Sequence, residues 1–299
     1  MTKLAKHQLW FAVLVGISLL VGWRALAGTF ALASTDVQYT YLFLIIPVSV
    51  ALIFLEWRSL RSVVTLSVHA GSVLLAIAVL TSCLALVKSA GFSSDLRLSI
   101  RVLALALWWI GTFVLCFGPR AARSVLFPLC FLLGLVPLPQ IAVNAIVAML
   151  QQGSAWAAYV LFAIYGVPVV RDGVLLTIPG LNLQIEEACS SIRSSTMLLV
   201  TAMVLAQLLL RSPWRKALVI VLAVPLSVAK NGLRIFIIAM LGTRVDPGYL
   251  TGKLHREGGS IFFAIVLLVV FALLWFLRWG EVVSQKSVLG QATADAIEG

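Results

Sequence analysis

The sequence has 299 residues, of which 62% are hydrophobic and only 11% are charged, and its mean hydropathy is +1.08. This composition excludes an ordinary soluble domain and predicts a protein that crosses a membrane several times. The formal net charge is +11, but the basic residues occur in twos and threes between apolar runs. That pattern is typical of topology determinants, so we expect membrane lipids and no nucleic acid as partners.

Eight apolar segments are each near the roughly 20 residues that are needed to cross the hydrocarbon core, and we predict an all-α polytopic fold with eight spans. Their approximate bounds are 9–27, 37–55, 63–87, 98–117, 125–150, 192–210, 217–241 and 261–277. The first segment could pass for a cleavable signal peptide, but Trp23 and Arg24 follow its apolar run and favour a retained helix. Pro137 and Pro139 interrupt the fifth, so we expect it to kink or to bend along the interface, with 144–165 partly in the outer interface.

The short basic loops predict the orientation. In an eight-span order, one side receives most of the basic clusters, namely Lys3/Lys6, Arg58/Arg61, Arg120/Arg123, Arg211/Arg215/Lys216 and Arg278/Lys286. The positive-inside rule assigns that side to the cytoplasm. We therefore expect a plasma (inner) membrane protein with both termini in the cytoplasm.

The hydrophobic period changes between residues 166 and 187. Short apolar runs are joined there by an Asp172-Gly173 turn and a Pro179-Gly180 turn, which predicts a small extracytoplasmic β-hairpin element. This element is either a linker or a scaffold for the polar stretch that follows. We expect one integral membrane domain over 1–299, made of four spans (1–124), a kinked span and interfacial helix (125–165), the β element (166–187), the last spans (188–280) and a mobile cytoplasmic tail (285–299).

A compact polar cluster, Glu-Glu-Ala-Cys-Ser-Ser-Ile-Arg, occupies 186–193. Cys189 lies where an apolar helix is expected to begin, so the positive helix end and the nearby Arg193 favour its thiolate, the nucleophilic form. The alternative is a small buried hydrophobe, with Ser190 acting only as a helix cap. The other three cysteines, Cys83, Cys116 and Cys130, lie in or beside apolar spans, where packing is the expected role.

The seventh predicted span contains Lys-Asn-Gly-Leu-Arg at 230–234. Charges inside a span are costly and usually face a polar cavity or a partner, which makes Lys230, Asn231 and Arg234 functional candidates. Lys230 and Arg234 are four residues apart and share a helix face. The alternatives are snorkelling and a structural ion pair with Glu186 or Glu187.

The last predicted outer loop contains His255, the one histidine on the same predicted side as Cys189. An imidazole can activate a thiol and protonate a leaving amine near neutral pH, although a lone loop histidine can also be merely solvated. With a guanidinium for the oxyanion, this set can form a thioester. Neither CxxC nor HExxH spacing occurs, so we expect no metal and no cofactor.

The segments Ala-Cys-Ser-Ser-Ile-Arg (188–193) and Asn-Gly-Leu-Arg (231–234), together with His255, resemble the exosortase/archaeosortase family of membrane-embedded cysteine transpeptidases. The resemblance is specific over about 166–263, and Ser191 departs from the glycine that the family often has there. It implies catalytic Cys189, Arg234 and His255. From their positions beside these residues, we expect supporting roles for Arg193, Asn231, Lys230 and Glu187.

The resemblance also implies substrates, namely exported proteins with a C-terminal transmembrane sorting signal of the PEP-CTERM type. They would be cleaved on the extracytoplasmic side and passed to an amine acceptor or to water. Two other functions stay open at this point: a transporter or assembly factor for anionic solutes, and a cysteine-dependent membrane acyltransferase.

Overall fold

The computed structural model describes residues 3–57, 64, 67–87, 91–185, 192–250 and 259–298. In these ranges eight helices are long and apolar enough to cross a membrane, and a small antiparallel sheet interrupts them. The predicted all-α polytopic fold with a β element is thus confirmed. The chain divides into two compact units, Met1–Val143 and Asn144–Gly299. The division falls at the start of the stretch 144–165, which was predicted to lie partly in the interface.

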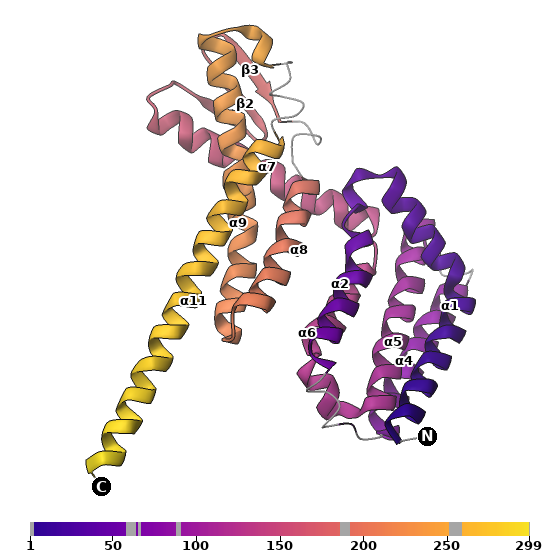
Figure 1. The fold of residues 1–299 in the computed structure, drawn as a ribbon. Helices are drawn as coiled ribbons and strands as arrows, with labels where there is room; N and C mark the ends of the chain where they lie inside the picture. The colour runs from indigo at the N-terminus through magenta and orange to yellow at the C-terminus, as the bar shows by residue number, and fades with distance from the viewer. Residues whose placement is uncertain are drawn as a thin grey trace. The chain divides into compact units, whose positions relative to one another are not determined.

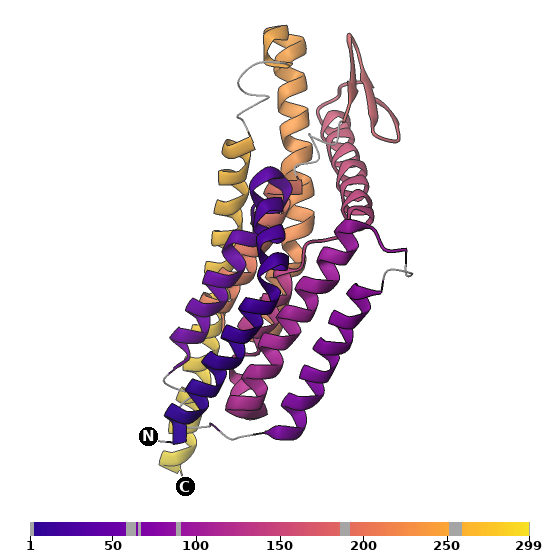
Figure 2. The same ribbon diagram turned by 90° about the vertical axis from the view of Figure 1, so that its right-hand side faces the viewer.

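The first unit is a helix bundle around α5. Its helices are α1 (Lys3–Thr35), η1 (Val37–Tyr39), α2 (Leu42–Leu55), α4 (Val68–Leu86), α5 (Ser94–Ser124), α6 (Leu126–Phe131) and η3 (Leu132–Leu135). Helix α5 packs against α4 and α1 (Figures 1 and 2). Gly118 has a positive φ of 88° and kinks α5 just before Pro119, because only glycine enters this region of backbone space without strain.

The predicted fifth span, 125–150, has the wrong bounds. The short α6 and η3 end at Leu135, and a new helix, α7 (Gln140–Ile164), begins beyond the prolines. The hydroxyl of Ser99 donates to the carbonyl of Pro137 (2.6 Å), which ties the break to the second turn of α5. The prolines lack the N–H donors that a continuous helix needs, so the apolar run becomes two helices, and the second extends to Ile164.

The second unit contains the sheet and the last three long helices. It begins at Asn144, inside α7. Its further elements are β1 (Val170–Asp172), β2 (Leu175–Ile178), β3 (Leu181–Gln184), α8 (Ile192–Leu209), α9 (Pro213–Arg244), η5 (Pro247–Leu250) and α11 (Gly259–Glu298). Helices α8, α9 and α11 pack on one another (Figure 1). Helix α11 continues through the polar stretch that was predicted as a tail.

The sheet has the order β1-β2-β3, and both turns are as predicted, with positive φ at Gly173 (59°) and Gly180 (81°). Its inner face is apolar: Leu176 is fully buried and Ile178 is 4% exposed. These side chains share a core with Phe162 of α7 and with the C-terminal part of α9. The sheet is therefore fixed to two helices, α7 and α9.

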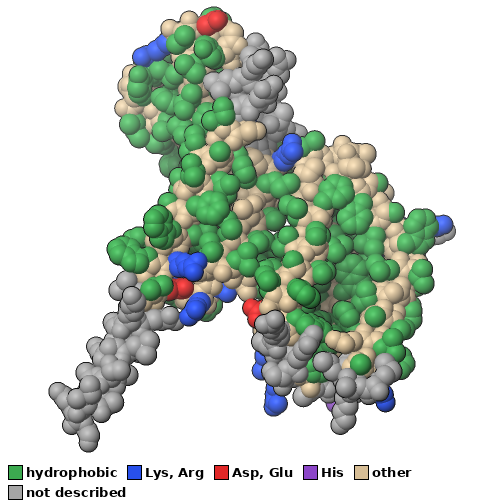
Figure 3. Space-filling view, in the orientation of Figure 1, with side chains coloured by type: hydrophobic (Ala, Val, Ile, Leu, Met, Phe, Trp, Pro, Cys, Tyr) green, Lys and Arg blue, Asp and Glu red, His purple; other side chains and the backbone are tan. Residues whose placement is uncertain are grey.

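Charged side chains lie close together where α8 connects to α9. The Glu281 carboxylate of α11 accepts from the backbone N–H groups of Arg211 (3.0 Å) and Ser212 (2.8 Å). The Lys216 ammonium donates to the Gln207 side chain (2.8 Å). Elsewhere the spans seen in Figure 3 are covered mostly by apolar side chains, as expected for helices that face lipid.

Candidate functional site

The polar residues of α9 face different neighbours, because successive side chains on a helix are about 100° apart. Asn231 faces α7, where its amide donates to the Ser154 hydroxyl (2.9 Å), and both residues are only 1% exposed. Gly232 lies against the same helix, and a Cβ at this position would be 2.5 Å from the Cβ of Ala157. These two positions hold α7 and α9 in close contact.

Lys230 is buried between α9 and α8. Its side chain is 6% exposed, and its ammonium donates to the hydroxyl of Ser194 in the first turns of α8. One turn earlier on α9, the Ser227 hydroxyl lies 2.6 Å from that of Ser195. A line of hydrogen bonds therefore sets the register of α8 on α9. It also gives the buried ammonium a polar partner, without which burial would be costly.

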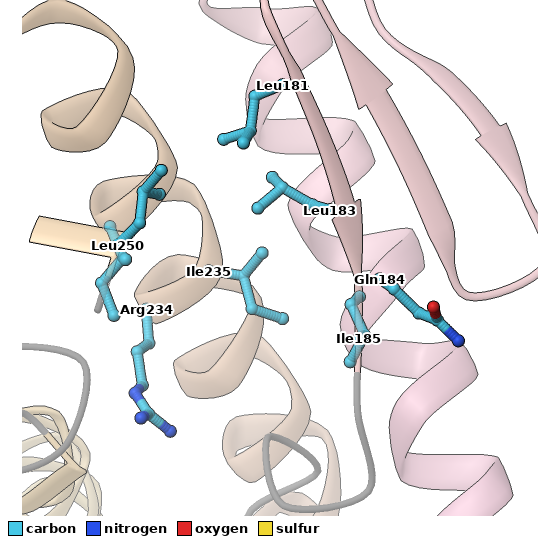
Figure 4. Close-up of a pocket in the computed structure, with 8 residues that line it drawn as sticks. Leu181, Leu183, Gln184, Ile185, Arg234, Ile235 and Leu250 are labelled. Carbon is cyan, nitrogen blue, oxygen red and sulfur yellow. The ribbon is translucent and has the colours of Figure 1, made fainter. Parts of the chain in front are cut away.

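Arg234 lies one turn beyond Lys230 and lines a pocket between α9 and β3 (Figure 4). The pocket has a volume of about 140 Å³, and its lining residues are Leu181, Leu183, Gln184, Ile185, Arg234, Ile235, Ile238 and Leu250. Leu183 and Ile235 point toward each other across it, while the Gln184 amide points away. Among these described residues Arg234 carries the one charge, so the pocket is an apolar recess with one cationic residue in its lining, and the Arg234 guanidinium points away from Leu181 and Leu183 in Figure 4.

Two anchored residues bound this pocket. The N–H of Ile185 donates to the carbonyl of Val174 (3.2 Å), and the carbonyl of Ile185 accepts from the Gln151 amide of α7 (3.2 Å). Leu250 packs onto Gly242 of α9, where an added Cβ would come within 2.5 Å of the Leu250 side chain. Ile185 and Leu250 are also the last described residues before 186–191 and 251–258.

The structure describes some of the predicted site residues and leaves others outside its described ranges. Glu187, Cys189 and His255 lie outside the described residues. Arg193 is exposed in the first turn of α8. In the described ranges, no group of three or more His, Cys, Asp or Glu side chains is placed to hold a metal ion.

Three polar residues that support this region were not predicted from the sequence: Gln151, Ser154 and Ser194. The available signal was the presence of hydrogen-bonding side chains inside apolar helices. Spacing alone could not distinguish them from polar residues that face solvent. Their role follows from the partners that the fold brings to them.

A model of the transmembrane exosortase family matches residues 33–272, which is most of the chain. No curated protein and no solved structure matches significantly. The match covers most of each unit, all residues that line the pocket, and the whole of the 186–193 and 230–234 segments.

Proposed function

Because the chain belongs to the transmembrane exosortase family, we propose that it is a cysteine transpeptidase or protease acting on exported proteins at a C-terminal sorting signal of the PEP-CTERM type. Cys189 is the nucleophile in this proposal, Arg234 the oxyanion donor and His255 the general acid. The observation that carries it is the pocket of Arg234, which is bounded by the two residues that lead into the Cys189 and His255 segments.

The connectivity of the chain supports this assignment of Cys189, Arg234 and His255. Cys189 follows Ile185 by four residues and precedes the start of α8 by three. Four residues extend at most about 14 Å. His255 follows Leu250 by five residues and precedes the start of α11 by four. Both groups are therefore tethered at each end to elements of the second unit, within a short reach of the Arg234 pocket.

The depth of Arg234 in α9 also supports the proposal. Arg234 lies 21 residues after Pro213, or about 32 Å along the helix. The hydrocarbon core is about 30 Å thick. If the basic connection around Arg211 is cytoplasmic, the guanidinium reaches the outer boundary of the membrane. A substrate anchored by its own transmembrane helix would present its cleavage segment at this depth, which supports an active site on the extracytoplasmic side.

The chemistry proceeds in two stages. The Cys189 thiolate attacks the scissile carbonyl carbon, a C–S bond forms, and the oxygen becomes an oxyanion that the Arg234 guanidinium stabilises. The C–N bond then breaks as the electron pair returns, and His255 gives its proton to the departing amine, which leaves a thioester. An acceptor amine, or water, attacks the thioester, loses a proton to His255 and releases the thiolate.

The supporting residues fit around these steps. Arg193, exposed in the first turn of α8, adds a positive charge four residues after Cys189 and favours the thiolate. Asn231 and Lys230 fix α9 against α7 and α8 and so hold the helix that carries Arg234. Glu187 lies two residues before Cys189, and we assign it a supporting role in orienting the cationic groups.

The test uses the full chain, expressed with exported reporter proteins that carry candidate C-terminal signals, and intact mass spectrometry of the reporters. We expect loss of the C-terminal anchor with the wild-type chain and no loss with Cys189→Ala. The control that replaces Cys83, Cys116 and Cys130 by Ala together should keep cleaving.

Other outcomes contradict the proposal. Cleavage that persists in Cys189→Ala would remove the nucleophile. An added acyl chain on the reporter would indicate an acyltransferase, and an unchanged reporter mass across the signals would favour a transporter or assembly factor.

A further inference from the structure

We infer that the pocket between β3 and α9 is a specificity subsite that takes one medium-sized apolar side chain of the substrate, next to the peptide bond that is cleaved. This inference rests on the proposed function, because it makes the pocket part of the same reaction. It goes further by naming the side-chain class that the enzyme selects and the residues that select it.

The lining of the pocket indicates the class of side chain. Six of its eight residues are aliphatic: Leu181, Leu183, Ile185, Ile235, Ile238 and Leu250. The Gln184 amide points away (Figure 4). A neutral polar side chain that enters among these six residues would lose water and meet mostly aliphatic neighbours, whereas an aliphatic one would gain from leaving water.

The volume indicates the size. The pocket measures about 140 Å³, and a cavity of about 150 Å³ lined by aliphatic and aromatic residues holds one benzene molecule. A valine or leucine side chain is of this size, and an indole is larger. The subsite should therefore favour branched aliphatic side chains over both glycine and tryptophan.

The position links the pocket to the reaction. Arg234 lines it from α9, and Ile185, four residues before Cys189, lines it from the end of β3. A substrate whose side chain fills the recess has its backbone near this guanidinium and near the start of the cysteine segment. This arrangement suits a residue adjacent to the scissile carbonyl.

The walls are stiff enough to discriminate by size. Leu183 belongs to β3 and pairs with the fully buried Leu176 of β2. Ile238 on the opposite wall is 6% exposed within α9. Side chains held by packed neighbours yield little to a ligand of the wrong shape.

The probes are acetyl-amino-acid chloromethyl ketones with glycine, valine, leucine, tryptophan or glutamate at the variable position. A thiolate displaces chloride from such a ketone and forms a C–S bond, so labelling needs no known substrate. The full chain is labelled in detergent, and the rate at each cysteine is followed by peptide mass spectrometry. We expect Cys189 to react at least about 10-fold faster with the leucine probe than with the glycine probe, as for other side-chain pockets.

Two variants test whether the pocket is the source of the preference for the leucine probe. Leu183→Trp should fill the pocket and lower the ratio of the leucine rate to the glycine rate to about one, and the Tm of the variant in detergent shows whether the fold is intact. Asn182→Trp is the matched control, since it adds the same ring to the adjacent, exposed position on the other face of β3, and it should keep the leucine preference.

The outcomes separate the two proposals. Selective labelling of Cys189 at equal rates with all probes overturns the subsite but leaves the nucleophile in place. Equal labelling of Cys189 and the exposed Cys130 overturns the proposed function and the subsite with it. A glutamate probe that reacts fastest overturns the apolar subsite and assigns Arg234 to recognition of a substrate carboxylate. A leucine preference that survives Leu183→Trp also overturns the subsite.

Discussion

The close contact of α9 with α7 predicts that Gly232→Ala damages the enzyme although it is a conservative change. The new Cβ would lie 2.5 Å from the Ala157 Cβ and 3.0 Å from the backbone N of Ala158. Carbon atoms in contact are normally about 3.5–4.0 Å apart. The two helices must therefore separate by about 1 Å, because neither neighbouring atom belongs to a flexible side chain.

This separation has a cost in stability and in rate. Overpacking a close contact typically costs about 1–3 kcal/mol, and the adjacent Asn231–Ser154 hydrogen bond (2.9 Å) would be stretched as well. Arg234 lies two residues further along α9, and a displacement of about 1 Å at a catalytic group can lower the rate about 100-fold. We expect a lower Tm in detergent and about 100-fold slower reporter cleavage at matched protein levels.

Gly16→Ala is the control for this substitution. Gly16 is also inside a long helix, α1, but no atom lies within 4 Å of its added Cβ. Replacing glycine by alanine inside a helix is favourable by up to about 1 kcal/mol when there is room. Gly16→Ala should therefore be neutral or stabilising. If Gly232→Ala is as stable and as active as Gly16→Ala, the close packing of α7 and α9 does not position Arg234.

Two further predictions test the electrostatics and the topology. Arg234→Lys should lose about 10²–10³ of the cleavage rate, nearly as much as Arg234→Ala, because an ammonium keeps the charge but not the fixed fork of two donors; turnover close to that of the wild type would assign the oxyanion to another donor. On a background lacking native cysteines, a cysteine at position 249 in η5 should react with an impermeant maleimide from outside the cell, and one at position 216 should react only after the membrane is opened; outside labelling at 216 would overturn the orientation.

The sequence predicts most of the fold because local signals determine it. Apolar runs of membrane length define the helices, and the turn residues at Asp172-Gly173 and Pro179-Gly180 define the strands. The fifth span was misplaced because hydropathy continues across Pro137 while the backbone cannot. Where a proline break falls inside an apolar run, the helix ends depend on tertiary contacts such as that between Ser99 and Pro137.

The candidate site was only partly predictable for a related reason. Spacing correctly placed Lys230 and Arg234 inside a span, but it could not assign each polar group to a neighbour. Lys230 binds Ser194 of α8, whereas Asn231 binds Ser154 of α7. These pairs depend on how three helices pack, and no periodicity in α9 alone encodes them.

The different lengths of α8 and α9 explain why Arg234 lies at a pocket. The Ser195–Ser227 contact sets the register of the two helices. Beyond it, α8 extends only three residues back to Ile192, while α9 continues to Arg244, about 25 Å further. Arg234 therefore lies past the end of α8, where β3 and η5 become the neighbours of α9. A guanidinium one turn earlier, at the depth of Lys230, would be enclosed between two helices, and the extra length of α9 is what brings Arg234 to the pocket beside β3 and η5.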